Sequence, residues 1–168
     1  MGLDMYLYAR KYVSGVDYSR ENEQVVRTPV PAFTEIIGAV GLGLEEVCQD
    51  FPSVELHAKV GYWRKANQIH KWFVDNVQEG VDDCGKYFFE REKLVELLTL
   101  CQQISVDKSL AGDLLPSESG FFFGSTEYDE WYYEQIDDTI AILERILNNP
   151  KFETSGLHGW DFYYQSSW

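Results

Sequence analysis

Both ends of this chain alternate between apolar and polar residues, which is the pattern of a strand with one buried face. Across residues 3–13, the apolar positions are Leu3, Met5, Leu7 and Ala9, and the others are Asp4, Tyr6, Tyr8, Arg10 and Tyr12. Residues 160–168 alternate in the same way, with Trp160, Phe162 and Tyr164 against Asp161, Tyr163 and Gln165. We predict that these first and last strands are neighbours in one sheet.

Helical and short strand patterns lie between the two ends. Apolar residues recur at helical spacing in residues 62–78 (Tyr62, Ala66, Ile69, Phe73, Val77), in residues 91–104, and in residues 127–148, where Thr126 is the expected N-cap. Short strands are expected at residues 54–60, 86–89 and 121–123. Residues 14–31 are polar and contain Pro29 and Pro31, which indicates a loop, and residues 32–51 combine helical spacing with three glycines.

This order of elements predicts an α+β fold. We expect a small antiparallel or mixed sheet that pairs the N- and C-terminal strands and is covered by about three amphipathic helices. A length of 168 residues, without a linker or an internal repeat, fits a single domain over residues 1–168.

Cysteine usage and the start of the chain indicate the compartment. The three cysteines, Cys48, Cys84 and Cys101, are widely spaced and form no CxxC pair, which argues against a disulfide framework and fits a reducing environment. The N-terminus lacks the pattern of a signal peptide, and no apolar run is long enough to span a bilayer. We therefore expect a cytoplasmic protein that does not bind a membrane.

The net charge of −14 is unevenly distributed. Residues 1–71 hold nine acidic and eight basic side chains, whereas residues 72–168 hold nineteen and six. This balance argues against direct nucleic-acid binding, unless through the first half, and favours a basic partner protein. The acidic residues of the third helix, Glu130, Glu134, Asp137 and Asp138, form either a solvated face or a docking surface for such a partner.

Two stretches suggest a pocket for a small polar ligand. In the first, Trp63, Arg64, Asn67 and His70 combine an aromatic ring, a cation, an amide and an imidazole, and His70 is the candidate general acid or base. In the second, Ser125, Thr126 and Asp129 stand where a helix begins. Tyr6 or Tyr8 would complete the pocket. The alternative is that Trp63 fills the core, that Asn67 and His70 are bonded boundary residues, and that the second stretch is an ordinary N-cap.

Asp82 and Asp83 are candidate ligands for a divalent cation beside His70. Consecutive aspartates before Gly85 are equally typical of a turn. The chain contains no Ser-His-Asp, HExxH or Rossmann motif, and no cofactor is indicated.

Several blocks of the chain resemble an uncharacterised family of small bacteriophage and prophage proteins. They are the opening Gly2–Leu7, the block Gly61–Phe73, Asp82–Gly85, Leu114–Pro116, Ser119–Asp129 and the ending Asp161–Trp168. The resemblance does not extend to residues 14–53, and it implies no catalytic residue. It implies a phage accessory protein acting in a bacterial cytoplasm.

Three hypotheses for the function follow. The first is a phage accessory protein that binds a host protein, for example to counter host defence, through the acidic residues of the third helix. The second is a pocket protein that binds or modifies a nucleotide-like small molecule. A structural or assembly role is the third, and the tyrosine-rich face of the first strand is also suited to a homo-oligomer interface.

Overall fold

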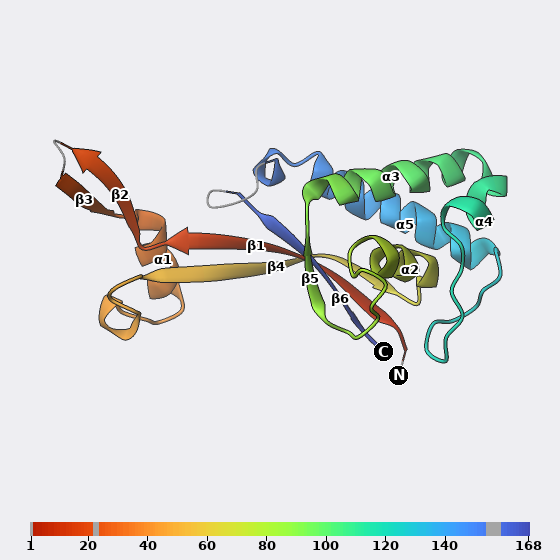
Figure 1. Ribbon diagram of the computed structural model, residues 1–168, viewed down its shortest axis with the longest axis horizontal. Helices are drawn as coiled ribbons and strands as arrows, with labels where there is room; N and C mark the ends of the chain where they lie inside the picture. The colour runs from red at the N-terminus through yellow and green to blue at the C-terminus, as the bar shows by residue number, and fades with distance from the viewer. Residues whose placement is uncertain (1, 22–23, 154–158) are drawn as a thin grey trace.

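Four antiparallel strands form the central sheet of the computed structural model, which describes residues 2–21, 24–153 and 159–168 (Figure 1). In sheet order, these strands are β4 (Ser53–Arg64), β1 (Asp4–Ser14), β6 (Asp161–Ser167) and β5 (Lys86–Phe89). β1 pairs with β6 from Asp4 opposite Ser167 to Arg10 opposite Asp161. The α+β class and the pairing of the two terminal strands are therefore confirmed.

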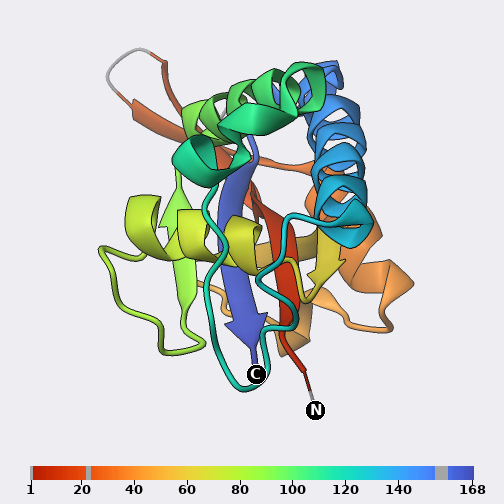
Figure 2. The same cartoon turned by 90° about the vertical axis from the view of Figure 1, so that its right-hand side faces the viewer.

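Helices gather on one side of this sheet (Figures 1 and 2). They are α2 (Asn67–Asn76), α3 (Arg91–Val106), the single turn α4 (Ala111–Leu114) and α5 (Glu130–Leu147). Three of them carry the expected apolar stripe: α2 buries Ile69 and Phe73, α3 buries Leu94, Leu97, Cys101 and Ile104, and α5 buries Tyr132, Ile136, Leu143 and Ile146. The helices cover the sheet because each stripe needs an apolar surface to pack on.

The period of two along β1 decides which side chains meet the helices. Met5, Leu7 and Ala9 are fully buried beneath them, whereas Tyr6 and Tyr8 point to the other face and stay half-exposed. β6 follows the same rule, so that Phe162 and Tyr164 join the core.

A close approach between α5 and β4 depends on Gly61. A Cβ atom at this position would lie 2.9 Å from Cγ2 of Ile142 on α5 and 3.1 Å from Cβ of Leu7 on β1. Arg145 of α5 donates a hydrogen bond of 2.7 Å to the carbonyl of the adjacent Val60. Any larger residue at position 61 would push the helix away from the sheet.

The far ends of β1 and β4 extend away from the helices to a second, smaller unit of structure (Figure 1). It contains the hairpin of β2 (Val16–Glu21) and β3 (Gln24–Pro29), the helix α1 (Pro31–Ala39) and a 3₁₀ turn at Leu44–Glu46. The prediction of a loop at residues 14–31 was therefore wrong. The described side chains of β3 are mostly exposed, so this hairpin lacks the alternation that marks a strand over a core.

Two other predicted elements differ in the structure. The helix expected from residue 62 begins at Asn67, because Tyr62, Trp63 and Arg64 pair with β1 as the end of β4. The strand expected at residues 121–123 is a turn, in which Phe121 is 96% exposed and no strand pairs with it among the described residues. Whether a segment becomes a strand depends on hydrogen bonds to a second strand that is distant in the sequence. The local pattern of residues does not show whether such a partner is present.

Candidate functional site

A cleft of about 470 Å³ lies between α2, the loop that joins α2 to β5, and the turn that carries three phenylalanines. This volume lies within the range of small-molecule sites, about 300–1,000 Å³. We call it the aromatic cleft, and it is lined by His70, Lys71, Val74, Asp75, Asp82, Glu118, Ser119, Gly120, Phe121, Phe122, Phe123 and Trp168.

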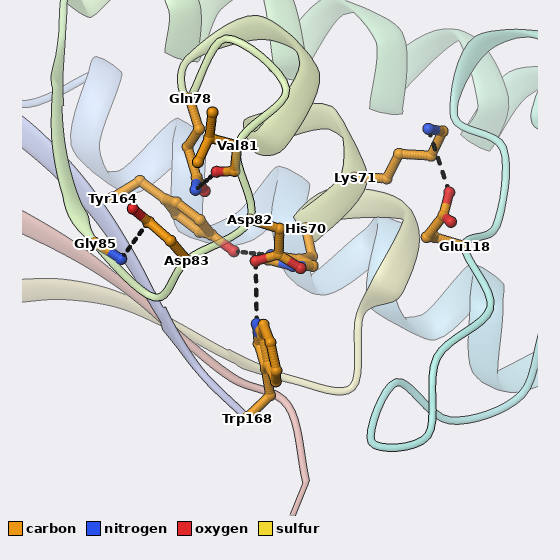
Figure 3. A network of polar contacts seen from close by, with 10 residues as sticks. All are labelled: His70, Lys71, Gln78, Val81, Asp82, Asp83, Gly85, Glu118, Tyr164 and Trp168. Carbon is orange, nitrogen blue, oxygen red and sulfur yellow. Dashed lines mark hydrogen bonds and ion pairs between the residues drawn. The ribbon is translucent and has the colours of Figure 1, made fainter.

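A chain of hydrogen bonds crosses the base of the cleft (Figure 3). The hydroxyl of Tyr164 lies 2.7 Å from Nδ1 of His70, whose Nε2 lies 3.1 Å from Oδ2 of Asp82. The indole N–H of Trp168 donates to the other oxygen of Asp82 over 3.0 Å. His70 is only 1% exposed, and both of its ring nitrogens are bonded.

Tyr164 and Asp82 bond the two ring nitrogens of His70 in different ways. Its ring is fully buried and stacks on Phe73 at 4.0 Å between centroids, and burial raises the pKa of its hydroxyl well above the ordinary value for tyrosine. The hydroxyl therefore stays protonated, and it closes the hydrogen bond at Nδ1 of His70. The Asp82 carboxylate can only accept, so Nε2 of His70 is the donor in the other bond. This arrangement holds the Asp82 carboxylate in place at the cleft. His70 would exchange a proton with a ligand only by giving up one of these two bonds.

The aromatic wall of the cleft depends on Asn67. Its buried side-chain amide donates to the carbonyls of Phe123 (3.2 Å) and Ser125 (2.8 Å), and its oxygen accepts from the backbone N–H of Glu118 (3.0 Å). Asn67 thus anchors both ends of the turn over residues 118–125. Phe123 then packs edge-on against the His70 ring at 5.1 Å between centroids.

The charge of the cleft is negative. Lys71 pairs with Asp75 at 3.1 Å and with Glu118 at 3.2 Å, and its hydrogen bonds to both carboxylates raise its pKa. Asp82 adds a third carboxylate, and Lys71 is the only Lys or Arg side chain among the described residues that line the cleft. An anionic ligand would meet an unfavourable field here, whereas a cation would be attracted.

Asp82 and Asp83, the two candidate metal ligands, point in different directions. Oδ1 of Asp83 accepts from the N–H of Gly85 at 2.8 Å, and Oδ2 accepts from the hydroxyl of Tyr87 at 3.0 Å. Asp83 thus closes the turn before β5, while Asp82 faces His70. Within the described parts of the chain, no three His, Cys, Asp or Glu side chains are grouped as a metal site requires.

The remaining predicted residues lie away from the cleft lining. Trp63 is 2% exposed in the core and donates to Oγ1 of Thr139 at 2.9 Å, and Arg64 is exposed at the end of β4. Ser125 and Thr126 are exposed, and Asp129 is the N-cap of α5, accepting from the N–H of Tyr132, so that Thr126 is not the cap. Tyr6 and Tyr8 lie on the face of the sheet that the helices do not cover.

Of the predicted residues, His70 and Asp82 line the cleft together, with Asn67 holding its wall. Trp168, Glu118 and Tyr164 were missed by the sequence reasoning. The alternation of the last strand offered one signal, because it placed the polar hydroxyl of Tyr164 on a core-facing position, where it requires a partner.

Comparisons of this chain with protein-family models, with curated proteins and with solved structures found no match.

Proposed function

We propose that the protein binds a small organic cation in the aromatic cleft. The observation that carries this proposal is the Asp82 carboxylate, which His70 and Trp168 hold in place beside a wall of aromatic rings. A carboxylate next to aromatic rings is the combination that recognises a positively charged organic group, through an ion pair and through cation–π contact.

The same features bear on the nucleotide-like ligand expected from the sequence. The phenylalanine rings and Trp168 suit the flat ring of a base. Phosphates, however, would be repelled by Asp75, Asp82 and Glu118, which outnumber the one lysine. A cationic ring without phosphates therefore fits the cleft better than a nucleotide does.

The blocks that resemble the phage family also support a role for the cleft. His70 and Lys71 come from the block Gly61–Phe73, Asp82 from Asp82–Gly85, the phenylalanines from Ser119–Asp129, and Trp168 from the C-terminal block. Four separate blocks of that resemblance thus meet around one cavity. The proposal is accordingly a phage accessory protein that binds this ligand in the cytoplasm of a bacterial host.

Binding of benzylamine, a cation with one aromatic ring, tests the proposal. We expect benzylamine to shift the indole N–H resonance of Trp168 in the NMR spectrum, and benzoate, its anionic counterpart, to leave that resonance unchanged. In the variant Asp75→Asn/Glu118→Gln, the cleft keeps one carboxylate and one ammonium, so we expect the Kd for benzylamine to rise about tenfold.

The control is Asp50→Asn, which removes one acidic charge from an exposed position that does not line the cleft. It should leave the affinity within about twofold, since a screened surface charge acts weakly. Equal binding of benzoate and benzylamine, or unchanged binding in the double variant, would contradict the proposal.

A second candidate function is docking of a basic host protein on α5. Glu130, Glu134, Asp137 and Asp138 form what we call the acidic surface, and all four side chains are exposed. Within the described part of the chain, none of them is ion-paired with a Lys or Arg side chain, so their charges are available to a partner.

Charge reversal of these four residues to lysine tests this candidate. We expect the wild-type protein to capture a basic partner from a bacterial lysate, and the reversed variant to retain less than about a tenth of it, because like charges now face each other. The matched control reverses Glu35, Glu45, Asp50 and Glu153, four exposed acids outside α5. Equal loss of capture in both variants would indicate a general effect of net charge and would exclude the acidic surface as the docking site.

A further inference from the structure

We propose that the uncovered face of the four-stranded sheet binds single-stranded nucleic acid by stacking bases on its tyrosines. We call this surface the open sheet face, and its central residues are Tyr6, Tyr8, Lys59, Tyr62, Lys86 and Tyr163. It lies on the side of the sheet opposite the helices, so the inference is independent of the aromatic cleft.

Strand register places the aromatic rings of this face side by side. Tyr8 lies directly opposite Tyr163, and Tyr6 lies opposite Tyr62. The ring centroids of Tyr6 and Tyr62 are 5.6 Å apart, and those of Tyr6 and Tyr8 are 6.1 Å apart. The tyrosines of β1, β4 and β6 thus form a continuous platform. All are half-buried or exposed, so their rings are accessible to a flat partner.

Cations lie among these rings. Nζ of Lys59 is 4.2 Å from the centroid of the Tyr6 ring, and Nζ of Lys86 is 4.7 Å from that of Tyr8 and 5.1 Å from that of Tyr163. Lys86 also contacts Nδ1 of His57 at 3.0 Å. Within the described residues, neither lysine is paired with a carboxylate.

The acidic groups of this face lie toward its ends and are already bonded. Asp4 accepts a hydrogen bond from the hydroxyl of Tyr62, and Glu55 and Asp161 pair with Arg10 at 3.4 and 2.9 Å. Basic side chains on this face are at least as numerous as acidic ones, whereas the whole chain has 14 basic and 28 acidic residues. Its centre is positive, in a protein that is otherwise strongly acidic.

Aromatic rings alternating with cations on an antiparallel sheet match the chemistry of single-stranded nucleic acid. Unpaired bases stack on aromatic side chains, and the phosphates between them are neutralised by nearby lysines. A duplex keeps its base faces stacked internally, so it could not use the tyrosine rings to offset the repulsion between its phosphates and a net charge of −14. We therefore expect preference for single strands, with a Kd of about 1–100 µM, the range of non-specific binding.

Fluorescence anisotropy of a labelled oligothymidylate of about twenty nucleotides tests this inference. We expect binding that weakens as salt increases, and no binding of the corresponding duplex at the same concentration. Tyr8→Ala and Tyr163→Ala should each weaken binding about tenfold or more, because each removes a ring on which a base stacks. Tyr8→Phe and Tyr163→Phe keep the rings and should bind as the wild type does.

Two further variants test the role of charge and the location of the binding face. Lys59→Gln/Lys86→Gln should lower the slope of log Kd against log salt by roughly 0.7 for each phosphate that a lysine no longer neutralises. Tyr18→Ala, on the β2–β3 hairpin, removes an exposed tyrosine outside this face and should leave binding unchanged. Absence of oligothymidylate binding below about 100 µM at low salt would overturn the proposal. So would a wild-type protein that sediments as a dimer, binds no oligonucleotide and becomes monomeric in Tyr163→Ala, because the face would then bind a second copy.

Discussion

A chain that ends at Gly159 is expected to remain unfolded. This truncation removes β6, which lies inside the sheet between β1 and β5. Seven consecutive residues of β1 would lose their partners on one side, and β5 would lose its only neighbour among the described strands. Three buried side chains, Phe162, Tyr164 and Ser166, would leave the core. Circular dichroism and the dispersion of amide resonances would show the loss of the fold.

The matched control is a chain that ends at Ser167. It keeps β6 and removes only Trp168, which is 43% exposed and lies at the cleft. This chain should fold with nearly wild-type stability and bind benzylamine less tightly. A cooperative thermal transition in the chain ending at Gly159 would contradict the structural role that we assign to the last strand.

Trp63→Ala is expected to destabilise the protein by about 3–5 kcal/mol, the usual cost of removing a large aromatic residue from a core. Trp63 is buried beneath α5, contacts Phe73 at 6.2 Å between ring centroids, and donates to Thr139. The truncation leaves a cavity and removes the hydrogen bond. Thermal or urea denaturation would measure the effect, with a fall in Tm of roughly 10 °C for a chain of this size.

Trp131→Ala provides the matched control, because Trp131 is 51% exposed on α5 and should cost less than about 1 kcal/mol. Trp63→Phe keeps an aromatic ring but removes part of the buried volume together with the hydrogen bond to Thr139, so we expect an intermediate cost of about 1–3 kcal/mol. If Trp63→Ala left stability unchanged and instead reduced ligand binding, Trp63 would belong to a binding site, as the pocket predicted from the sequence with Asn67 and His70 requires.

The proposed sites lie on different parts of one scaffold. β6 contributes to two of them, because Tyr163 points to the open sheet face while Tyr164 bonds His70 beneath the aromatic cleft. The alternation of side chains along a strand thus supplies both surfaces from adjacent residues. The acidic surface is separate, on the exposed side of α5. Variants of Tyr163 and of the cleft carboxylates should therefore have independent effects.

The pocket was partly predictable from the chain. The amide of Asn67 and the imidazole of His70, three residues apart on a predicted helix, indicated a pocket, and both residues lie at or behind the cleft. Both are buried and hydrogen-bonded within the protein, which agrees with the alternative that they are bonded residues of the helix margin. Trp63 was grouped with them on the assumption of one continuous helix. The change from strand to helix between Arg64 and Asn67, with Lys65 at a φ of 59°, placed it in the core instead.

The amino-acid sequence by itself determined the local elements whose side chains alternate or repeat over an apolar surface: β1, β6, α3 and most of α5. Their hydrophobic periodicity is a property of the chain, and it requires that each bury one face. Tertiary structure alone decided the end of β4, the hairpin at residues 16–29, the turn of the three phenylalanines and the meeting of Tyr164, His70, Asp82 and Trp168. These features depend on hydrogen bonds between segments far apart in the chain, and no local pattern records which distant group will be the partner.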